Sequence, residues 1–572
     1  QFLLKLRVVS CEIIDSASAS MQRFQQYAAV LLLCLASPAF ALRDNSVVEG
    51  HLESQTTSGT PVRGFNLAEY KVGVGVTVLV LVIGIIGSVI IKRSYQSEEA
   101  EESKEQLHGA GRKSKRASLV IGAQGDEGVL SNMEGDECET EQTKSGLSQF
   151  DVTANFAIAA LGAGVVVFPR VMADTGYIVA TCLLMTASIA ACICGLVIVQ
   201  CCDMAERVAG SPKGSLTGYE AMAEAALGAK GKYALTFSKN LFFMGIIIVY
   251  FTFETDALGL WLPKSVSAFS IRWFIVLPVF LGLALLRDLK AVAKFAIVGI
   301  IAAVCQTLGL CGGGLFEIFL SDRPGAPPKT YLAAELDIAK MGAALSTFVF
   351  GFGCIATLPS IRSQMTNADE LPGALKSGLC IVVLVYMSVM WIGYMAFADH
   401  VDSNMILSIG GSNCQGLQCA MGSISALSII LNLVISMPTF AFCINSAFEN
   451  AGIMFTPLSP LNIVCRASLI IAMCFVSYKL SYAQQIISIL AAIFAICNNF
   501  LFPIGCYYSL LKQDVSVLRE EQAEVPPTQK AGVLTYVTHG IVVIIGLATM
   551  IFGVKGGVTS LLKAMEAAAP HE

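Results

Sequence analysis

The chain has 572 residues, of which 55% are hydrophobic and only 14% are charged, and its formal net charge at pH 7 is −5. This number of polar side chains is too small to cover the surface of a soluble globular protein of this size. The composition therefore excludes a soluble protein and predicts a polytopic membrane protein. No basic domain or aromatic-basic stripe occurs, and we expect no nucleic-acid partner.

Most of the 19 cysteines lie inside apolar segments, where a thiol behaves as a small hydrophobe. The sequence contains no Cys/His spacing typical of a metal site, no phosphate-binding glycine loop and no nucleophile elbow. We therefore expect no metal, no cofactor and no enzymatic activity.

The N-terminal region resembles a processing region. Residues 1–20 carry no pattern that we can interpret. Residues 21–41 follow the layout of a secretory signal peptide, with Arg23, an apolar run and a small-x-small site ending at Ala41. Residues 42–71 are polar and predict a loose luminal or extracellular segment.

Residues 72–91 are apolar over a length that can cross the bilayer and are followed by Lys92 and Arg93. This pattern predicts an extra transmembrane helix whose C-terminal flank stays in the cytosol. A bipartite plastid leader over 21–91 is the alternative interpretation, although the acidic residues Asp44 and Glu49 in the spacer argue against it.

Residues 92–150 form a charged, Gly/Ser-rich segment that cannot bury enough apolar area to fold, and we expect a disordered cytosolic linker. Its basic run, Arg112 to Arg116, is compatible with a solvated tether or with a contact to lipid headgroups.

Residues 151–555 form the expected core, followed by a C-terminal tail over 556–572. Apolar stretches long enough to span a bilayer recur eleven times. Alternate loops are basic, which places the N-terminal end of the core in the cytosol and its C-terminal end outside. Cys414 and Cys419 share an outer loop, where a disulfide and two free thiols are both compatible with the sequence. The eleven stretches are 152–171, 177–200, 236–258, 271–287, 291–311, 340–359, 375–397, 421–447, 462–480, 485–511 and 533–553.

The first stretch contains an unusual glycine pair, Gly162 and Gly164, between Asn155 and Pro169. Glycine costs about 1 kcal/mol relative to alanine in a helix interior, so the pair needs a reason. Small residues allow neighbouring helices to pack closely, or they allow the backbone to unwind and expose N–H and C=O groups to a solute.

Several stretches in order resemble the amino acid/auxin permease family of the amino acid-polyamine-organocation superfamily. The likeness covers nearly all of 150–553, and the co-occurrence of the stretches is more specific than any single motif. They are Asn155 to Pro169 followed by Thr175-Gly176-Tyr177, Tyr219 to Lys232 with Gly228 and Gly231, Tyr250, Phe350-Gly351-Phe352-Gly353 with Pro359 and Met365, and Gly393-Tyr394 with Phe397.

The resemblance implies an all-α polytopic fold with an eleven-helix core of two inverted five-helix repeats, in which helices one and six are interrupted, beside the extra N-terminal helix. The doublets Gly162/Gly164 and Gly351/Gly353 occupy corresponding positions if each repeat has five helices. This pairing favours unwinding over simple packing.

The implied function is secondary active transport of an amino acid. The substrate carboxylate is expected at the N–H groups after Gly164, and the ammonium group at freed carbonyls near both doublets. The expected substrate-binding residues are Ala160, Leu161, Gly162, Ala163, Gly164, Val165, Phe350, Gly351, Phe352, Gly353 and Tyr250.

Coupling candidates are the intramembrane acids Glu254 and Asp256, and the motif residue Asn155. Sodium-coupled members of the family carry a second Asn where this chain has Ile158, so we expect proton symport rather than sodium symport. A transporter-like amino acid sensor and a carrier of another metabolite remain alternatives. We expect a multi-pass protein of the plasma membrane or an endomembrane, with the plastid envelope left open.

Overall fold

The computed structural model describes nine segments and two single residues of the chain. The predicted signal peptide, polar spacer and extra helix, and the linker up to residue 146, lie outside the described residues. The described residues are 147–162, 164–216, 218–285, 296–320, 330, 337–411, 414, 416–450, 459–479, 483–520 and 532–568.

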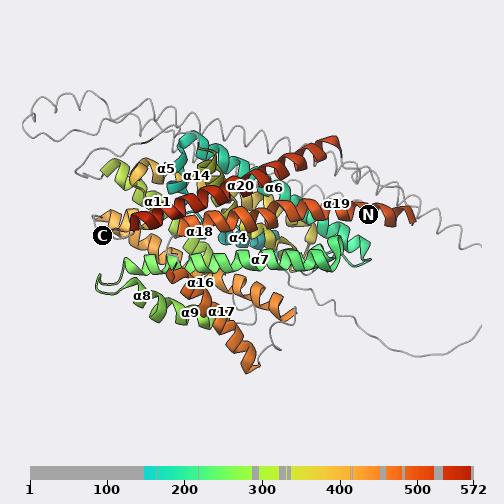
Figure 1. The fold of residues 1–572 in the computed structure, drawn as a ribbon, viewed down its shortest axis with the longest axis horizontal. Coiled ribbons are helices and arrows are strands. Elements are labelled where there is room, and N and C mark those ends of the chain that lie inside the picture. The colour runs from blue at the N-terminus through green and yellow to red at the C-terminus, as the bar shows by residue number, and fades with distance from the viewer. Residues whose placement is uncertain are drawn as a thin grey trace, which may run out of the picture. The chain divides into compact units, whose positions relative to one another are not determined.

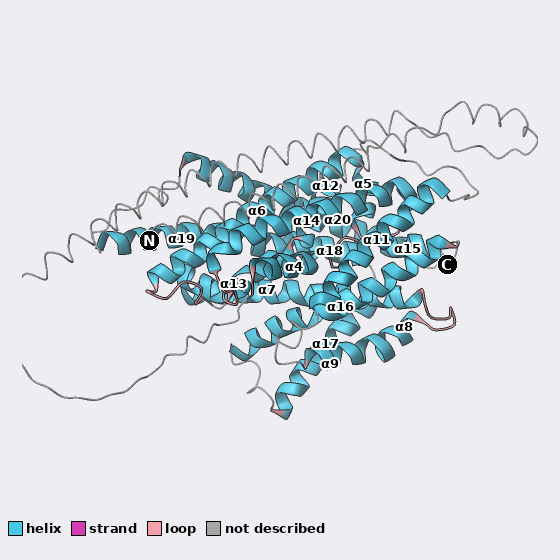
Figure 2. Ribbon diagram, turned by 180° about the vertical axis from the view of Figure 1, so that it is seen from behind, coloured by secondary structure: helices cyan, strands magenta, loops and turns pink. Residues whose placement is uncertain are grey.

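Helices account for nearly all of the described chain (Figure 2). The N-terminal half contains α4 (Gln149–Ala160), α5 (Phe168–Thr175), α6 (Tyr177–Val208), α7 (Tyr219–Gly259), α8 (Ala268–Ile271), the π-helical η1 (Arg272–Val276), α9 (Leu277–Ala284) and α11 (Ala296–Leu320).

The C-terminal half begins with α12 (Ile338–Gly351), the 3₁₀-helix η2 (Gly353–Thr357), α13 (Leu358–Arg362), the 3₁₀-helix η3 (Ala368–Glu370), α14 (Leu371–Phe397) and the 3₁₀-helix η4 (Ala398–His400). It continues with α15 (Met405–Gly410), α16 (Leu417–Asn450), α17 (Pro460–Lys479), α18 (Ala483–Leu490), the π-helical η5 (Ala491–Ala495) and η6 (Cys497–Leu501), α19 (Phe502–Glu520) and α20 (Val533–Ala568). Among the described residues, β-pairing is limited to an isolated parallel bridge between Leu147 and Met365.

Within the described residues, eight helices are long and apolar enough to cross a membrane. The bent pair of α12 with η2 and α13 would make a ninth span. The expected stretches 152–171 and 271–287 fall on α4 with α5 and on η1 with α9, which are too short or too interrupted to count as single spans. The chain therefore has the architecture of a multi-pass membrane protein, and the number eleven stays a prediction.

The longest helices pack along one another. α11 and α7 both lie against α16, and α12 lies against α20. α7 and α19 run alongside one another in Figure 1. Many large apolar side chains of α20 and α17 are exposed, as is normal for helices that face lipid hydrocarbon.

Two elements extend further than the sequence pattern indicated. α7 begins at Tyr219, inside the stretch expected as a cytosolic loop, and turns at Gly228, whose φ of 69° is readily available only to a residue without a Cβ. α20 continues to Ala568, past the core boundary expected at 555. Both helices hold their hydrogen bonds beyond the apolar part of the sequence, where hydropathy alone gives no signal.

Cys414 and Cys419 form a disulfide, with their Cα atoms 5.2 Å apart. This resolves the pairing that the sequence left open. The bridge lies just before and within the first turn of α16, so it ties the loop to the start of that helix.

Candidate functional site

Two helices lose their regular winding at the glycine doublets. The first is interrupted between Ala160, the last residue of α4, and Phe168, the first residue of α5. In the connection between them, the Val167 N–H donates to the Gly164 carbonyl over 3.2 Å. Pro169 then sits in the first turn of α5, where its missing N–H has no effect on the helix.

The second interruption is tighter. α12 ends at Gly351, Phe352 has φ −100° and ψ 14°, and η2 follows at once as a 3₁₀-helix. Pro359 lies in the first turn of α13. The two halves of this broken span are bent by 41° relative to each other.

The two interruptions meet through their glycines. A Cβ added to Gly164 would lie 3.3 Å from the Gly351 Cα, and one added to Gly351 would lie 2.8 Å from Phe168 Cζ. None of the four doublet glycines has a positive φ. Gly164 and Gly351 therefore allow two backbones to approach closely, whereas Gly162 and Gly353 face the side chains of Tyr250 and Phe242. The packing interpretation and the unwinding interpretation hold together.

A small cavity lies at this meeting point. Its volume is about 20 Å³, which is room for about one water. The cavity is therefore too small, as it stands, for a molecule larger than a water. The cavity is lined by Ala159, Ala160, Gly164, Ile246, Tyr250, Phe350, Gly351, Gly353, Cys354 and Phe440.

Six of the residues expected at the site line this cavity, namely Ala160, Gly164, Tyr250, Phe350, Gly351 and Gly353. Leu161, Gly162, Val165 and Phe352 do not line it, and Ala163 lies outside the described residues. Four further lining residues were missed, namely Ala159, Ile246, Cys354 and Phe440. Ile246 lies one helical turn before Tyr250 on α7, which is a signal that the sequence did offer.

The residues that do not line the cavity support it from outside. A Cβ on Gly162 would lie 3.2 Å from the Tyr250 hydroxyl, so this glycine also marks a close contact. Val165 is buried, and the Phe352 ring packs edge-on against Tyr386 with centroids 5.5 Å apart.

The carbonyls freed by the interruptions are bonded by side chains that the sequence analysis did not select. The Tyr386 hydroxyl on α14 contacts both the Ala160 carbonyl and the Gly351 carbonyl, the latter over 2.8 Å. Asn432 on α16 donates to the Leu161 carbonyl over 3.2 Å. These buried residues carry no local signature, because their partners come from distant parts of the chain.

Tyr386 is therefore the side chain that joins both interruptions. Its ring also packs edge-on against Phe168, the first residue of α5, with centroids 4.6 Å apart. The Ala160 and Gly351 carbonyls are among those expected to receive an ammonium group. Each carbonyl oxygen has two lone pairs, so each keeps one for a further donor beside the Tyr386 hydroxyl.

The coupling candidates occupy different environments. Glu254 is 2% exposed, and its Oε1 has no hydrogen-bond partner among the described residues. Asp256 accepts from Asn404 Nδ2 over 3.4 Å. Asn155 lies half-buried on α4. Glu254 stands one turn beyond Tyr250 on α7, so it is on the same face of the helix as a cavity residue.

Comparison with known proteins gives the family. The model of the family described as "Transmembrane amino acid transporter protein" matches residues 145–552, which contain both interruptions and the cavity. The chain belongs to this family. It is a family of membrane transporters and not of enzymes.

Curated relatives in this family are distant. "Amino acid transporter AVT1D" from Arabidopsis thaliana is 20% identical over 364 residues, which are 62% of this chain and 62% of the relative. "Amino acid transporter AVT3A" from the same plant is 21% identical over 378 residues, 65% of this chain and 84% of the relative. "Vacuolar amino acid transporter 3" from Saccharomyces cerevisiae is 24% identical over 307 residues, 52% and 42% respectively. The chain thus spans about three fifths of the length of the first of these relatives.

Proposed function

We propose that this member of the transmembrane amino acid transporter family moves amino acids across a membrane by secondary active transport with alternating access. One observation carries the proposal: two interrupted helices meet through Gly164 and Gly351 around a cavity, with backbone carbonyls from both interruptions beside it. Exposed peptide groups at such a point suit a small zwitterion, because they offer both partial charges. The printed names of the relatives agree with an amino acid substrate.

The proposed architecture is the inverted repeat. The first five spans would run from α4 with α5 to α11, and the second five from α12 with α13 to α19, with α20 as the eleventh helix. Each repeat then begins with an interrupted helix, and the cavity lies between these two. The domain boundaries expected from the sequence belong to the same proposal.

The proposed substrate site uses the residues expected from the sequence: Ala160 to Val165, Phe350 to Gly353, and Tyr250. The carboxylate would lie at the backbone N–H groups after Gly164, and the ammonium group at the carbonyls of Ala160 and Gly351. Because the cavity holds about one water, substrate binding requires a state in which the interruptions are further apart.

The proposed driving ion is the proton, carried by Glu254. A carboxyl group buried in a membrane core without a cation partner is costly when charged, so it suits a site that gains and loses a proton during the transport cycle. Its place one turn from Tyr250 brings it near the substrate. Asp256 and Asn155 are the other coupling candidates, and Asp256 already has Asn404 as a partner.

The test is uptake of labelled amino acids by the full chain in proteoliposomes, across a substrate panel, with and without an inward proton gradient. We expect accumulation above equilibrium for some amino acids, and only with the gradient. Accumulation driven equally by sodium would overturn the proton as driver. Substrate binding without accumulation would instead indicate a sensor, and uptake of a metabolite other than an amino acid would reject the substrate class.

Two variants test the role of Glu254. In Glu254→Gln, uptake should lose its dependence on the proton gradient and fall to exchange or equilibration, because the group that titrates is gone. The matched control is Asp256→Asn, two residues along the same helix, which should keep gradient-driven accumulation. The reverse pattern would assign coupling to Asp256.

A further inference from the structure

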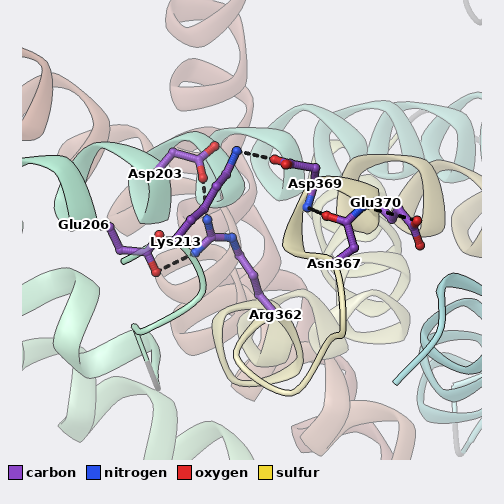
Figure 3. Close-up of polar contacts among 7 residues, drawn as sticks. All are labelled: Asp203, Glu206, Lys213, Arg362, Asn367, Asp369 and Glu370. Atoms are coloured by element: carbon purple, nitrogen blue, oxygen red, sulfur yellow. Dashed lines mark hydrogen bonds and ion pairs between the residues drawn. The ribbon is translucent and has the colours of Figure 1, made fainter. Parts of the chain in front are cut away.

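A cluster of charged side chains lies outside the cavity lining, at the end of α13 (Figure 3). Arg362 is the last residue of α13, and its Nη1 donates to Glu206 Oε1 over 2.7 Å and its Nη2 to Asp203 Oδ1 over 2.5 Å. Both acids belong to α6 and are three residues apart, so they lie on one face of that helix. The triad of Arg362, Asp203 and Glu206 thus joins α13 to α6.

The triad is largely removed from water. The side chains of Arg362 and Glu206 are 1% and 3% exposed, whereas that of Asp203 is 26% exposed. Glu206 Oε1 also accepts from the Leu216 N–H over 2.9 Å. Leu216 lies in the connection between α6 and α7, so three segments of the chain converge on one carboxylate.

Stability alone is a poor reason for this cluster. Arg362 Nε and Glu206 Oε2 are buried and have no hydrogen-bond partner in the described part of the chain. A buried charge network that is only partly satisfied stabilises a fold less well than apolar residues of the same size. Once the partners separate, however, water can hydrate each charge. Such a tie suits a contact that is made and broken.

The helix α13, which the triad joins to α6, is connected directly to the wall of the cavity. α13 follows the second interruption, and it is bent away from α12 by 41°. Between them lies η2, whose residue Cys354 lines the cavity. A movement of α13 about Phe352 would therefore also move Cys354 and that wall of the cavity. A contact that fixes α13 fixes this wall as well.

We propose that the triad is a latch that holds α13 against α6 and keeps the cavity closed toward the side on which α13 ends. The positions of the basic loops predict that this side is the cytosol. Release of Arg362 from the two acids is then a step in opening the cavity to that side. The latch rests on the proposed transport function, since only a protein that opens and closes needs one.

The chain offers a matched control for the latch. Lys213, in the connection after α6, pairs with Asp369 in η3 in the same region (Figure 3). The side chains of this pair are 53% and 63% exposed, so water already screens it, and it should contribute little to holding the helices. Neutralising Asp369 therefore removes a neighbouring ion pair and leaves all three charges of the triad in place.

The experiment measures the reactivity of native Cys354 in the full-length protein. Inside-out vesicles are treated with a membrane-impermeant maleimide, and the modified fraction of the Cys354 peptide is followed over time by mass spectrometry. In Glu206→Gln we expect the labelling rate to rise roughly tenfold, the effect of losing one charge-assisted hydrogen bond on an opening equilibrium. In Asp369→Asn the rate should stay within about twofold of the unmodified protein.

A second variant guards against misfolding from an unpaired buried arginine. The triple variant Arg362→Met, Asp203→Asn and Glu206→Gln removes every charge of the triad at once, which proteins tolerate better than removal of one partner. It should show the same increase in Cys354 labelling. Labelling in both triad variants equal to that of Asp369→Asn would overturn the latch.

The two proposals fail in different ways. If the unmodified protein shows no uptake of any amino acid, the transport function fails, whatever the labelling shows. If it transports, and Cys354 in the triad variants is no more reactive than in the control, the latch alone is wrong. Protection of Cys354 by a transported amino acid would link the two measurements, because that cysteine lines the cavity.

Discussion

The two interrupted helices use different geometry for the same purpose. In the first, α4 ends at Ala160 and α5 begins only at Phe168. In the second, only Phe352 separates α12 from η2, and the Ile355 N–H already bonds back to the Phe352 carbonyl over 3.2 Å. The first interruption therefore leaves more residues outside regular helix than the second does. If the two interruptions begin inverted repeats, as proposed above, we expect the repeats to divide binding and movement unequally.

The two interruptions also differ in the side chains that bond their carbonyl groups. Asn432 bonds only the first, through the Leu161 carbonyl, whereas Tyr386 touches the last helical residue before each of them. If the first interruption binds substrate and the second moves, substitutions should have effects that follow these contacts.

The largest effect is expected at the glycine contact. In Gly351→Leu, the new Cβ would already lie 2.8 Å from Phe168 Cζ and 3.1 Å from the Tyr386 ring, which is closer than van der Waals contact. The leucine side chain would therefore push the two interruptions apart. Uptake in proteoliposomes should be abolished.

Gly540→Leu on α20 is the control for Gly351→Leu, because no atom of the described residues lies within 4 Å of a Cβ at that glycine. Its uptake should equal that of the unmodified protein. Normal uptake by Gly351→Leu would exclude the proposed site.

A smaller effect is expected for Tyr386→Phe, which keeps the ring contacts and removes the hydroxyl. The variant loses the phenol proton, which can be donated to only one of the two freed carbonyls at a time, at a cost of about 1–3 kcal/mol in positioning. The maximal rate of uptake should fall roughly tenfold. The concentration dependence of uptake measures this, and an unchanged maximal rate would mean that Tyr386 only fills space.

The smallest effect is expected for Asn432→Leu, which removes one donor from the first interruption alone. Leu161 loses about 1 kcal/mol of hydrogen bonding, so affinity for substrate should fall roughly fivefold while the maximal rate changes little. The concentration for half-maximal uptake is the measurement. A drop in maximal rate larger than that of Tyr386→Phe would contradict the division between a binding and a moving interruption.

The sequence located the apolar helices and both interruptions well, because hydropathy and glycine doublets are local signals. Each of the eleven apolar stretches falls on a described helix or broken helix, although only eight stand as spans by length and composition. The sequence could not reveal Tyr386, since a tyrosine inside an apolar helix looks the same whether or not it meets a freed carbonyl. The sequence offered close packing and unwinding as explanations for the doublet glycines, and the structure has close contacts at these glycines together with interrupted helices.

The bridge between Leu147 and Met365 has a practical consequence for anyone who modifies this protein. The Leu147 N–H bonds the Gln364 carbonyl over 2.9 Å, and the Thr366 N–H bonds the Leu147 carbonyl over 3.1 Å. This short pairing joins the residue before α4 to the segment that follows α13. We therefore expect a movement of one segment to displace the other. A fluorescent tag or protease site inserted between Leu147 and Gln149 would cut this coupling, and reporters of movement are better placed elsewhere.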